Sequence, residues 1–268
     1  MSVKKIVLTG AGGMIGTVIR AYFQAEGRAL TLTDLRALEP LHAGETVLQG
    51  DLSDAAFCTQ LLAGADVVIH MAGVSNDQPL DVLLPHNFVA LNNLYVAAHT
   101  QGVARVIFAS SNHTIGMEAA GRKIDTRVPV NPDSYYGTSK VWGEALARMF
   151  WEKHGVESVC LRIGSFLPKP VSQRNLSTWL SHRDFCALLD ASVYTPGLGF
   201  EIVYGVSANT RAWWDNSTSR VPYQPRDNAE DFAAEIAHAA PPADAREALY
   251  QGGDYAARGF DRAAPAPL

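Results

Sequence analysis

The sequence predicts an α/β fold in which helices cover both faces of a doubly wound parallel sheet. A small C-terminal appendage is expected on the substrate side. Two observations support this prediction. Apolar strand-like runs alternate with helix-length segments as far as about residue 164. Several of these runs are nearly continuous Val, Ile and Leu, which is typical of parallel strands buried on both faces. A repeated strand and helix rhythm of this kind favours a doubly wound sheet over other fold classes.

The expected elements follow one another along the first part of the chain. Beyond Gly164 prolines interrupt the rhythm, leaving a helix near 182–192 and a strand near 201–204. We therefore expect residues 1–164 to form the core and residues 165–268 the appendage, within one integrated domain, with an extended tail from Ala256. The predicted strands are 3–9, 29–33, 46–49, 66–71, 105–110 and 158–163, and the predicted helices are 14–26, 55–63, 82–101 and 135–155.

Composition limits the function classes. A chain of 268 residues can bury a sizeable core, and its net charge of −5 argues against nucleic acid or an anionic membrane as its partner. Its apolar runs are too short for a membrane span or a signal peptide. The cysteines, Cys58, Cys160 and Cys186, form neither a paired framework nor a metal-ligand pattern. We expect a cytoplasmic protein with reduced cysteines, no metal site and a small-molecule partner.

A glycine-rich turn joins the first predicted strand to the first predicted helix. Glycines in such a turn let the chain bend sharply, approach a pyrophosphate closely and pack the helix on the sheet, while the helix N-terminus faces the phosphates. An ordinary glycine-rich turn is the alternative. The predicted dinucleotide-binding residues of this Rossmann-type turn are Gly10, Gly13, Met14, Ile15 and Gly16.

Acidic residues follow the next two strands. Asp34 ends the second strand, where a carboxylate accepts both hydroxyls of the adenine ribose and repels a 2′-phosphate. Arg36 could argue for NADP, but the carboxylate is better placed to decide, so NAD is the predicted cofactor. Asp51 and Leu52 follow the third strand. Asp51 could lie near the adenine amino group or begin the loop before the next helix.

Tyr136 and Lys140 lie four positions apart in a predicted helix, which places the phenol and the ammonium on one face. An ammonium beside a phenol favours the phenolate, so we expect the pKa of Tyr136 to fall from about 10 toward the working pH. Ser111 could hold a substrate oxygen against that base. Such a set suits the oxidation of an alcohol or the reduction of a carbonyl. Taken alone, a Tyr-x-x-x-Lys pair usually indicates an amphipathic surface helix.

These motifs stand in the order typical of the short-chain dehydrogenase/reductase superfamily, and the chain resembles its extended branch over at least residues 3–165. The segment 108–116 matches that family's serine segment. The resemblance implies an NAD-dependent oxidoreductase in which Tyr136 is the base, Lys140 holds the nicotinamide ribose and Ser111 orients the substrate oxygen. A helix cap or a backbone bond would explain Asn87 equally well. The further cofactor contacts implied are Met71, Ala72, Gly73, Asn87 and Ile163.

A narrower resemblance, to the uronate dehydrogenase family, extends through the C-terminal part in the segments 110–116, 162–165, 176–181, 207–209 and 213–217. It implies the oxidation of D-glucuronate or D-galacturonate at the anomeric carbon to an aldarolactone. A uronate carries a carboxylate, and Arg174 is the candidate to bind it, because a guanidinium pairs bidentately with a planar carboxylate. Without the resemblance, Arg174 would be interpreted as a solvated loop residue.

Other polar residues are expected to contact the sugar hydroxyls. His113 could instead be a core histidine bonded to backbone, and His70, on a buried strand, is expected to be structural. The predicted substrate contacts are Ser75, Ser111, Asn112, His113, Tyr136, Ser165 and Arg174.

Two other functions share these motifs. A nucleotide-sugar epimerase or dehydratase has the same fold and catalytic set, but usually a longer C-terminal region, and Asn112 stands where a dehydratase needs an acidic pair. A non-catalytic NAD-binding redox sensor commonly lacks the tyrosine or the lysine, and both are present here.

The family resemblance also implies a homodimer or higher homo-oligomer formed through the helices 82–101 and 135–155. Leu91, Leu94, Trp142 and Met149 are the apolar positions considered for this seam, although they could equally belong to the core.

Overall fold

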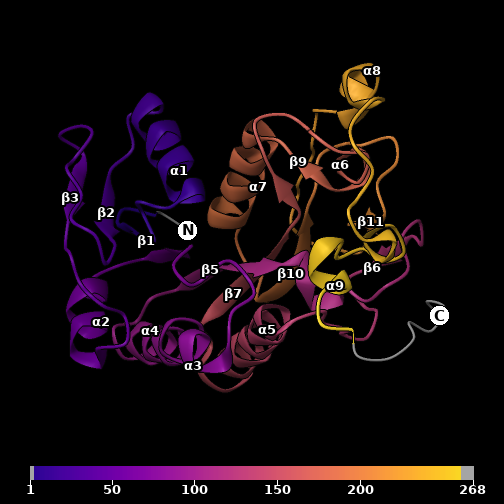
Figure 1. The fold of residues 1–268 in the computed structure, drawn as a ribbon. Coiled ribbons are helices and arrows are strands. Elements are labelled where there is room, and N and C mark those ends of the chain that lie inside the picture. Colours follow the sequence, from indigo (N-terminus) through magenta and orange to yellow (C-terminus); the bar gives the residue numbers. More distant parts are fainter. Residues whose placement is uncertain (1–2, 261–268) are drawn as a thin grey trace.

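The computed structural model describes residues 3–260, which form helical layers on both faces of one parallel sheet (Figure 1). The sheet has seven strands in the order β10-β7-β5-β4-β1-β2-β3, and every neighbouring pair is parallel. The predicted fold class is confirmed. The strands are β1 (Ile6–Thr9), β2 (Leu30–Thr33), β3 (Glu45–Val47), β4 (Val67–His70), β5 (Arg105–Ser111), β7 (Glu157–Ile163) and β10 (Phe200–Gly205).

Two cores lie on the two faces of this sheet. Helices α1 (Met14–Ala25) and α7 (His182–Tyr194) cover one face, while α2 (Ala55–Leu62), α4 (Ala90–Thr100) and α5 (Tyr135–His154) cover the other (Figure 1). Alternate residues of a single strand enter the two cores. In β1, Leu8 packs in the first core and Val7 in the second. Burial of both faces explains the nearly continuous apolar runs.

Short elements gather in the C-terminal region, around two small parallel pairs of strands. Among residues 3–260, none of the helices is both long and apolar enough to cross a bilayer. The pairs are β6 (Ile124–Asp125) with β11 (Trp214–Asp215), and β8 (Ser165–Phe166) with β9 (Trp179–Leu180). The helical turns are η2 (Asn112–Ile115), α6 (Asn175–Thr178), η3 (Ala229–Phe232), α8 (Ala233–Ile236), η4 (Ala245–Ala248) and α9 (Asp254–Ala257).

The C-terminal region contributes more to the main layers than we expected. The predicted strand near 201–204 forms β10, which pairs with β7 and extends the main sheet. The predicted helix near 182–192 forms α7 and packs in the same core as α1. The prediction of an extended tail from Ala256 is wrong at its start, because Ala256 lies in α9. The rest of that prediction, over 261–268, lies outside the described residues. The division at residue 164 stays a prediction.

The predicted helix 82–101 contains a π-helical turn. The segment runs through α3 (Leu80–Leu83), η1 (Leu84–Val89) and α4, and Ala90 N donates to Pro85 O, five residues earlier. Pro85 has no N–H to continue the ordinary ladder, which explains the wider turn at this point.

Of the four positions considered for an oligomer seam, two belong to the core. Leu91 and Leu94 are buried with α2 and β5 side chains, so the core alternative is correct for them. Met149 is exposed, and Trp142 is partly buried against the same core.

Helix α5 is anchored to the sheet by a buried ion pair. Glu144 on α5 accepts from Arg162 on β7 through two bonds of 2.9 and 2.8 Å, and from Ser110 Oγ on β5 at 2.6 Å. All three side chains are buried. Gly143 permits the close approach, because a Cβ there would lie 2.5 Å from Phe108 Cζ. The helix that carries Tyr136 is therefore fixed to two strands at once.

Replacing Glu144 by Ala should lower the free energy of unfolding by about 3–5 kcal/mol, because the guanidinium of Arg162 would stay buried without its partner. Urea denaturation measures this loss. Glu152→Ala on the same helix is the matched control, because Glu152 pairs with Arg148 on the exposed face, and its loss should stay under about 1 kcal/mol. Equal losses for the two variants would contradict this role of the buried pair.

Candidate active site

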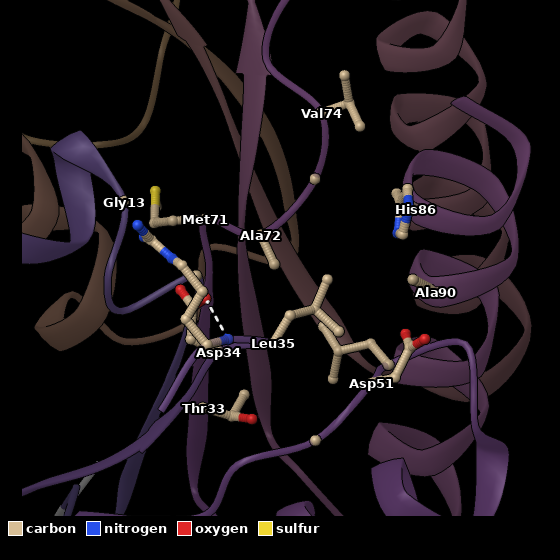
Figure 2. A pocket seen from close by; sticks show the side chains of 15 residues that line it. Gly13, Thr33, Asp34, Leu35, Asp51, Met71, Ala72, Val74, His86 and Ala90 are labelled. Atoms are coloured by element: carbon tan, nitrogen blue, oxygen red, sulfur yellow. Dashed lines mark hydrogen bonds and ion pairs between the residues drawn. The ribbon is translucent and has the colours of Figure 1, made fainter. Parts of the chain in front are cut away.

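A cavity of about 290 Å³ lies at the carboxyl ends of the strands, between β1 and β4, where the chain order of the sheet reverses. Ligands of doubly wound folds bind at this switch point. Figure 2 shows Thr33 and Asp34 on one side of the cavity and His86 and Ala90 on the helix opposite. The predicted residues that line the cavity are Gly10, Gly13, Asp34, Asp51, Leu52, Met71, Ala72 and Gly73.

The glycine turn fits a dinucleotide. Gly10 adopts φ +67°, and a Cβ there would lie 2.6 Å from Ala72 N. Gly16 has a packing role, since a Cβ would lie 2.2 Å from Gly10 O. Helix α1 begins after Gly13 without a side-chain cap. Its first N–H groups are therefore available to an anion such as a pyrophosphate.

The acidic residues that follow β2 and β3 hold the loops at the rim of the cavity. Asp34 Oδ2 accepts from Gly12 N at 2.9 Å, and Oδ1 accepts from Arg36 Nε at 3.4 Å. Arg36 therefore pairs with Asp34, although the two residues were weighed against each other as indicators of NADP and NAD. Asp51 Oδ1 accepts from Ser53 N at 2.8 Å, and this bond lowers the pKa of Asp51. Asp51 thus organises the loop, as one interpretation expects, and it also lines the cavity. Its place near the adenine amino group stays a prediction.

Several predicted cofactor residues lie outside the cavity wall. Met14 is exposed, and Ile15 packs partly buried against the first core. Asn87 bonds Val74 N and O at 2.8 and 3.0 Å and Ser139 Oγ at 3.0 Å, so the backbone-bond alternative is correct for it. Ile163 is buried at the end of β7.

Other residues that line the cavity were not predicted from the sequence. The position of Val74 is set by its hydrogen bonds with Asn87, and that of His86 by the π-helical turn. No sequence pattern marks either residue. The remaining missed residues are Thr33, Leu35, Gly50 and Ala90.

The predicted catalytic residues come together at the ends of β5 and α5. Ser111 ends β5, and its hydroxyl lies close enough to Tyr136, in the first turn of α5, to act on the pKa of the phenol. Ser134 caps that helix by accepting from Gly137 N at 2.9 Å, while Asp77 Oδ1 accepts from Tyr136 N at 3.2 Å. Tyr136 is buried, whereas its neighbour Tyr135 is 60% exposed, because adjacent residues of a helix point in different directions.

The expected fall in the pKa of Tyr136 is wrong for this structure. Burial raises the pKa of Tyr136 to about 12, although the neighbouring Ser111 hydroxyl acts in the opposite direction. Burial also lowers the pKa of Lys140 to about 8. Lys140 Nζ lies 5.0 Å from the ring centroid of Phe108 and 5.5 Å from that of Tyr136. Desolvation of the phenol outweighs the charge on which the expectation depended.

Arg174 contacts Asn112, the residue that follows Ser111 in the chain. With its amide placed so that Nδ2 donates to Ile163 O (3.0 Å), Asn112 Oδ1 accepts from Arg174 Nη2 at 3.1 Å. Arg174 also donates to Gln251 O through Nε at 3.0 Å and to Ser165 Oγ through Nη1 at 3.2 Å. Burial lowers the pKa of Arg174 to about 10. Among residues 3–260, no carboxylate forms an ion pair with it.

His113 and Ser75 border the same region. His113 Nδ1 lies 2.7 Å from Asp133 Oδ2, so the backbone-bonded alternative is wrong. The Tyr255 ring stacks on His113, and its hydroxyl donates to Ser75 O at 3.5 Å. No sequence motif contains Asp133, Gln251 or Tyr255. They could not be predicted, because only the fold brings them to the site.

Two expectations about other titratable residues are confirmed. His70 is buried, lies 2.8 Å from Thr9 Oγ1 through Nδ1, and has a pKa lowered to about 3 by burial, as a structural histidine would. The three cysteines are free and buried. Within the described part of the chain, no cluster of three or more His, Cys, Asp or Glu side chains could hold a metal ion.

Known proteins resemble the chain over nearly its whole length. The model of the NAD dependent epimerase/dehydratase family matches residues 6–176. Uronate dehydrogenase from Pseudomonas putida is 42% identical over 259 residues, which is 95% of this chain and 96% of that one.

Two solved structures have the same fold. The glucuronic acid dehydrogenase of Chromohalobacter salexigens has a TM-score of 0.91 at 39% identity, with 99% of each chain covered. A tyrosine-to-alanine mutant of uronate dehydrogenase from Agrobacterium tumefaciens, complexed with NAD, has a TM-score of 0.91 at 40% identity, with 96% of this chain and 98% of that one covered.

Lys140→Met should stabilise the ligand-free protein by about 1–3 kcal/mol near pH 7, because the buried ammonium disfavours folding. The pKa of Lys140 is lowered from 10.5 to about 8, so the full cost is present below pH 8. It disappears as the pH rises past 10.5, because over this interval the unfolded chain binds more protons than the folded one. Urea denaturation near pH 7 and near pH 10 should show the gap between variant and wild type narrowing. A less stable variant near pH 7 would contradict this expectation.

Proposed function

The chain belongs to the NAD dependent epimerase/dehydratase family and, within it, to the uronate dehydrogenases, and we propose that it oxidises a hexuronate with NAD. The substrate is D-glucuronate or D-galacturonate, and oxidation at the anomeric carbon gives the aldarolactone. One observation of the site supports this proposal above the others. The desolvated guanidinium of Arg174, which forms no ion pair with a carboxylate among residues 3–260, contacts Asn112, the residue that follows Ser111. It suits a small substrate that carries both a carboxylate and an oxidisable hydroxyl.

The residues that would hold NAD line the cavity between β1 and β4. The N-terminus of α1 would face the pyrophosphate, Asp34 would accept the hydroxyls of the adenine ribose, and Lys140 would bind the nicotinamide ribose. When bound, NAD supplies the acceptor for the hydride and the positive charge of its nicotinamide ring.

Tyr136 carries out the proton transfer. As a phenolate, it takes the proton of the anomeric hydroxyl while the hydride leaves the same carbon and the C=O bond forms. Ser111 donates to the substrate oxygen and holds it against the phenolate. Burial raises the pKa of Tyr136 to about 12, so the base needs positive charge close to it. Lys140, 5.5 Å from the ring centroid, supplies part of that charge.

The two parts of the chain divide the work in this proposal. Residues 1–164 hold NAD and the catalytic side chains, while residues 165–268 supply Ser165 and Arg174 to the substrate. We place the protein in the cytoplasm, as a homodimer or higher homo-oligomer. The free cysteines support the compartment, and the exposed apolar residues Leu80, Leu84 and Val96 near α4 support the assembly.

The test of the function is NADH formation by the purified protein on addition of D-glucuronate or D-galacturonate with NAD. Tyr136→Phe should reduce turnover to about 1% of wild type or below, because no base remains. NADH binding, followed by fluorescence, should be retained. Turnover of uronates close to the wild-type rate by Tyr136→Phe would contradict the assignment. Conversion of a nucleotide-sugar in place of uronates would favour an epimerase or dehydratase.

Arg174→Ala should raise the Michaelis constant for uronate by about two orders of magnitude, because the substrate carboxylate would lose a bidentate, charge-assisted partner. The Michaelis constant for NAD should stay unchanged. Arg174→Lys is the matched control, since it keeps the positive charge but loses the bidentate guanidinium. Its Michaelis constant for uronate should lie between those of wild type and Arg174→Ala. A change under about threefold for Arg174→Ala would count against this role.

A further inference from the structure

His113 is held on three sides at the edge of the catalytic residues. Its Nδ1 lies 2.7 Å from Asp133 Oδ2. Its ring stacks on Tyr255 with centroids 4.1 Å apart and planes at 20°, and it meets the ring of Tyr136 edge-on at 5.8 Å. The side chain keeps 15% of its surface exposed. The imidazole is therefore fixed in orientation and still accessible beside the proposed base.

The Asp133 carboxylate lies in a space that only glycines at the surrounding positions leave open. This carboxylate is fully buried, and its Oδ1 accepts from Ser134 Oγ at 2.7 Å. Glycines from three separate segments surround it. A Cβ at Gly116 or Gly252 would lie 1.7 or 1.9 Å from Oδ2, and one at Gly137 would lie 3.1 Å from Oδ1. A larger residue at Gly116 or Gly252 would displace the carboxylate from the imidazole.

This partner determines the hydrogen-bonding character of His113. An ionised carboxylate only accepts hydrogen bonds, so we assign the imidazole proton to Nδ1, and Nε2 of the neutral ring is left as an acceptor. No hydrogen bond among residues 3–260 uses Nε2, whereas Nδ1 is engaged by Asp133. Nε2 is available to a hydroxyl of a bound molecule.

Resting on the proposed function, we propose that Asp133 and Tyr255 are positioning residues for the substrate. Asp133 fixes the tautomer of His113, and Tyr255 fixes its plane. The Nε2 atom then accepts a hydrogen bond from a sugar hydroxyl close to the anomeric carbon. This contact complements Arg174, which binds the carboxylate, so the ring is held through two separate polar groups.

A second role for Asp133 has to be separated from this one. Its charge also raises the pKa of Arg174, so loss of the carboxylate could weaken substrate binding through the guanidinium instead. Only an effect of Asp133 that acts through the imidazole requires His113 to be present, whereas an effect that acts through Arg174 does not.

The tautomer can be measured directly, without turnover. In the full-length protein with NADH bound, 15N NMR of labelled histidines should show His113 protonated on Nδ1 and unprotonated on Nε2. The His113→Ala variant identifies the signal by its loss. An Nε2-protonated ring would overturn the proposal. This result is independent of whether the protein oxidises uronates, which the NADH assay decides.

Kinetics test the positioning role. Asp133→Asn should raise the Michaelis constant for the uronate that wild type oxidises by about tenfold, because the amide can donate to Nδ1 and favour the other tautomer. In the His113→Ala background, the same change should alter kcat/KM by less than about twofold. A full effect in that background would overturn the proposal and assign the carboxylate to Arg174 or to folding.

Two further variants keep the test decisive. Asp184→Asn is the matched control, since Asp184 is a buried carboxylate that accepts the N–H groups of Arg226 and Asp227 outside the site. It should lower the Tm and leave the Michaelis constant within about twofold of wild type. If Asp133→Asn does not fold, Tyr255 takes its place. Tyr255→Phe should keep the Michaelis constant within about twofold and Tyr255→Leu should raise it severalfold. Equal constants for the two would overturn the role of the ring.

Discussion

The docking of α5 on β5 and β7 is the constraint on which the active site depends. Glu144, buried with Arg162 and Ser110, ties the helix to both strands. Because a buried ion pair is costly to leave half-satisfied, this contact specifies one register of the helix against the sheet. Tyr136 and Lys140 lie about two turns and one turn before Glu144 on the same helix, so their positions relative to Ser111 are set by the core and not by the surface of the cleft.

The same docking sets the electrostatics of the site. Burial raises the pKa of Tyr136 to about 12 and lowers that of Lys140 to about 8, so both shifts favour the uncharged forms. The sequence predicted a lowered pKa for Tyr136, because the i, i+4 spacing reveals the neighbouring ammonium of Lys140. The spacing does not reveal that the phenol is buried, and burial raises its pKa. In the proposed mechanism, the charge of the ligand and the Ser111 hydroxyl bring the phenol toward its reactive form. In this proposal the groups become reactive only when the ligands are bound, and strongly shifted pKa values of this kind are common among buried catalytic groups.

Local patterns were sufficient to predict the sheet, the glycine turn and the catalytic helix. Gly10 and Asp34 each follow a buried strand directly, and Tyr136 is placed relative to Lys140 by helical periodicity alone. Asp133, Gln251 and Tyr255 could not be found in this way, because they reach the site through long-range packing. His86 depends on a π-helical turn that Pro85 imposes. β10 was recognised as a strand, but its place in the main sheet depends on pairing with β7, which the sequence of either strand does not specify.

The charge available at the proposed substrate region depends on which partner the buried carboxylate of Asp133 takes. A carboxylate close to a desolvated guanidinium would ordinarily pair with it, and a paired Arg174 would have little left to offer a uronate. Here Asp133 is instead committed to His113, inside a space that Gly116 and Gly252 keep open. Arg174 is held in place by neutral groups, namely Gln251 O, Ser165 and Asn112. Neutral partners fix the geometry of the guanidinium without cancelling its charge, and that charge then remains available for the carboxylate of the proposed substrate.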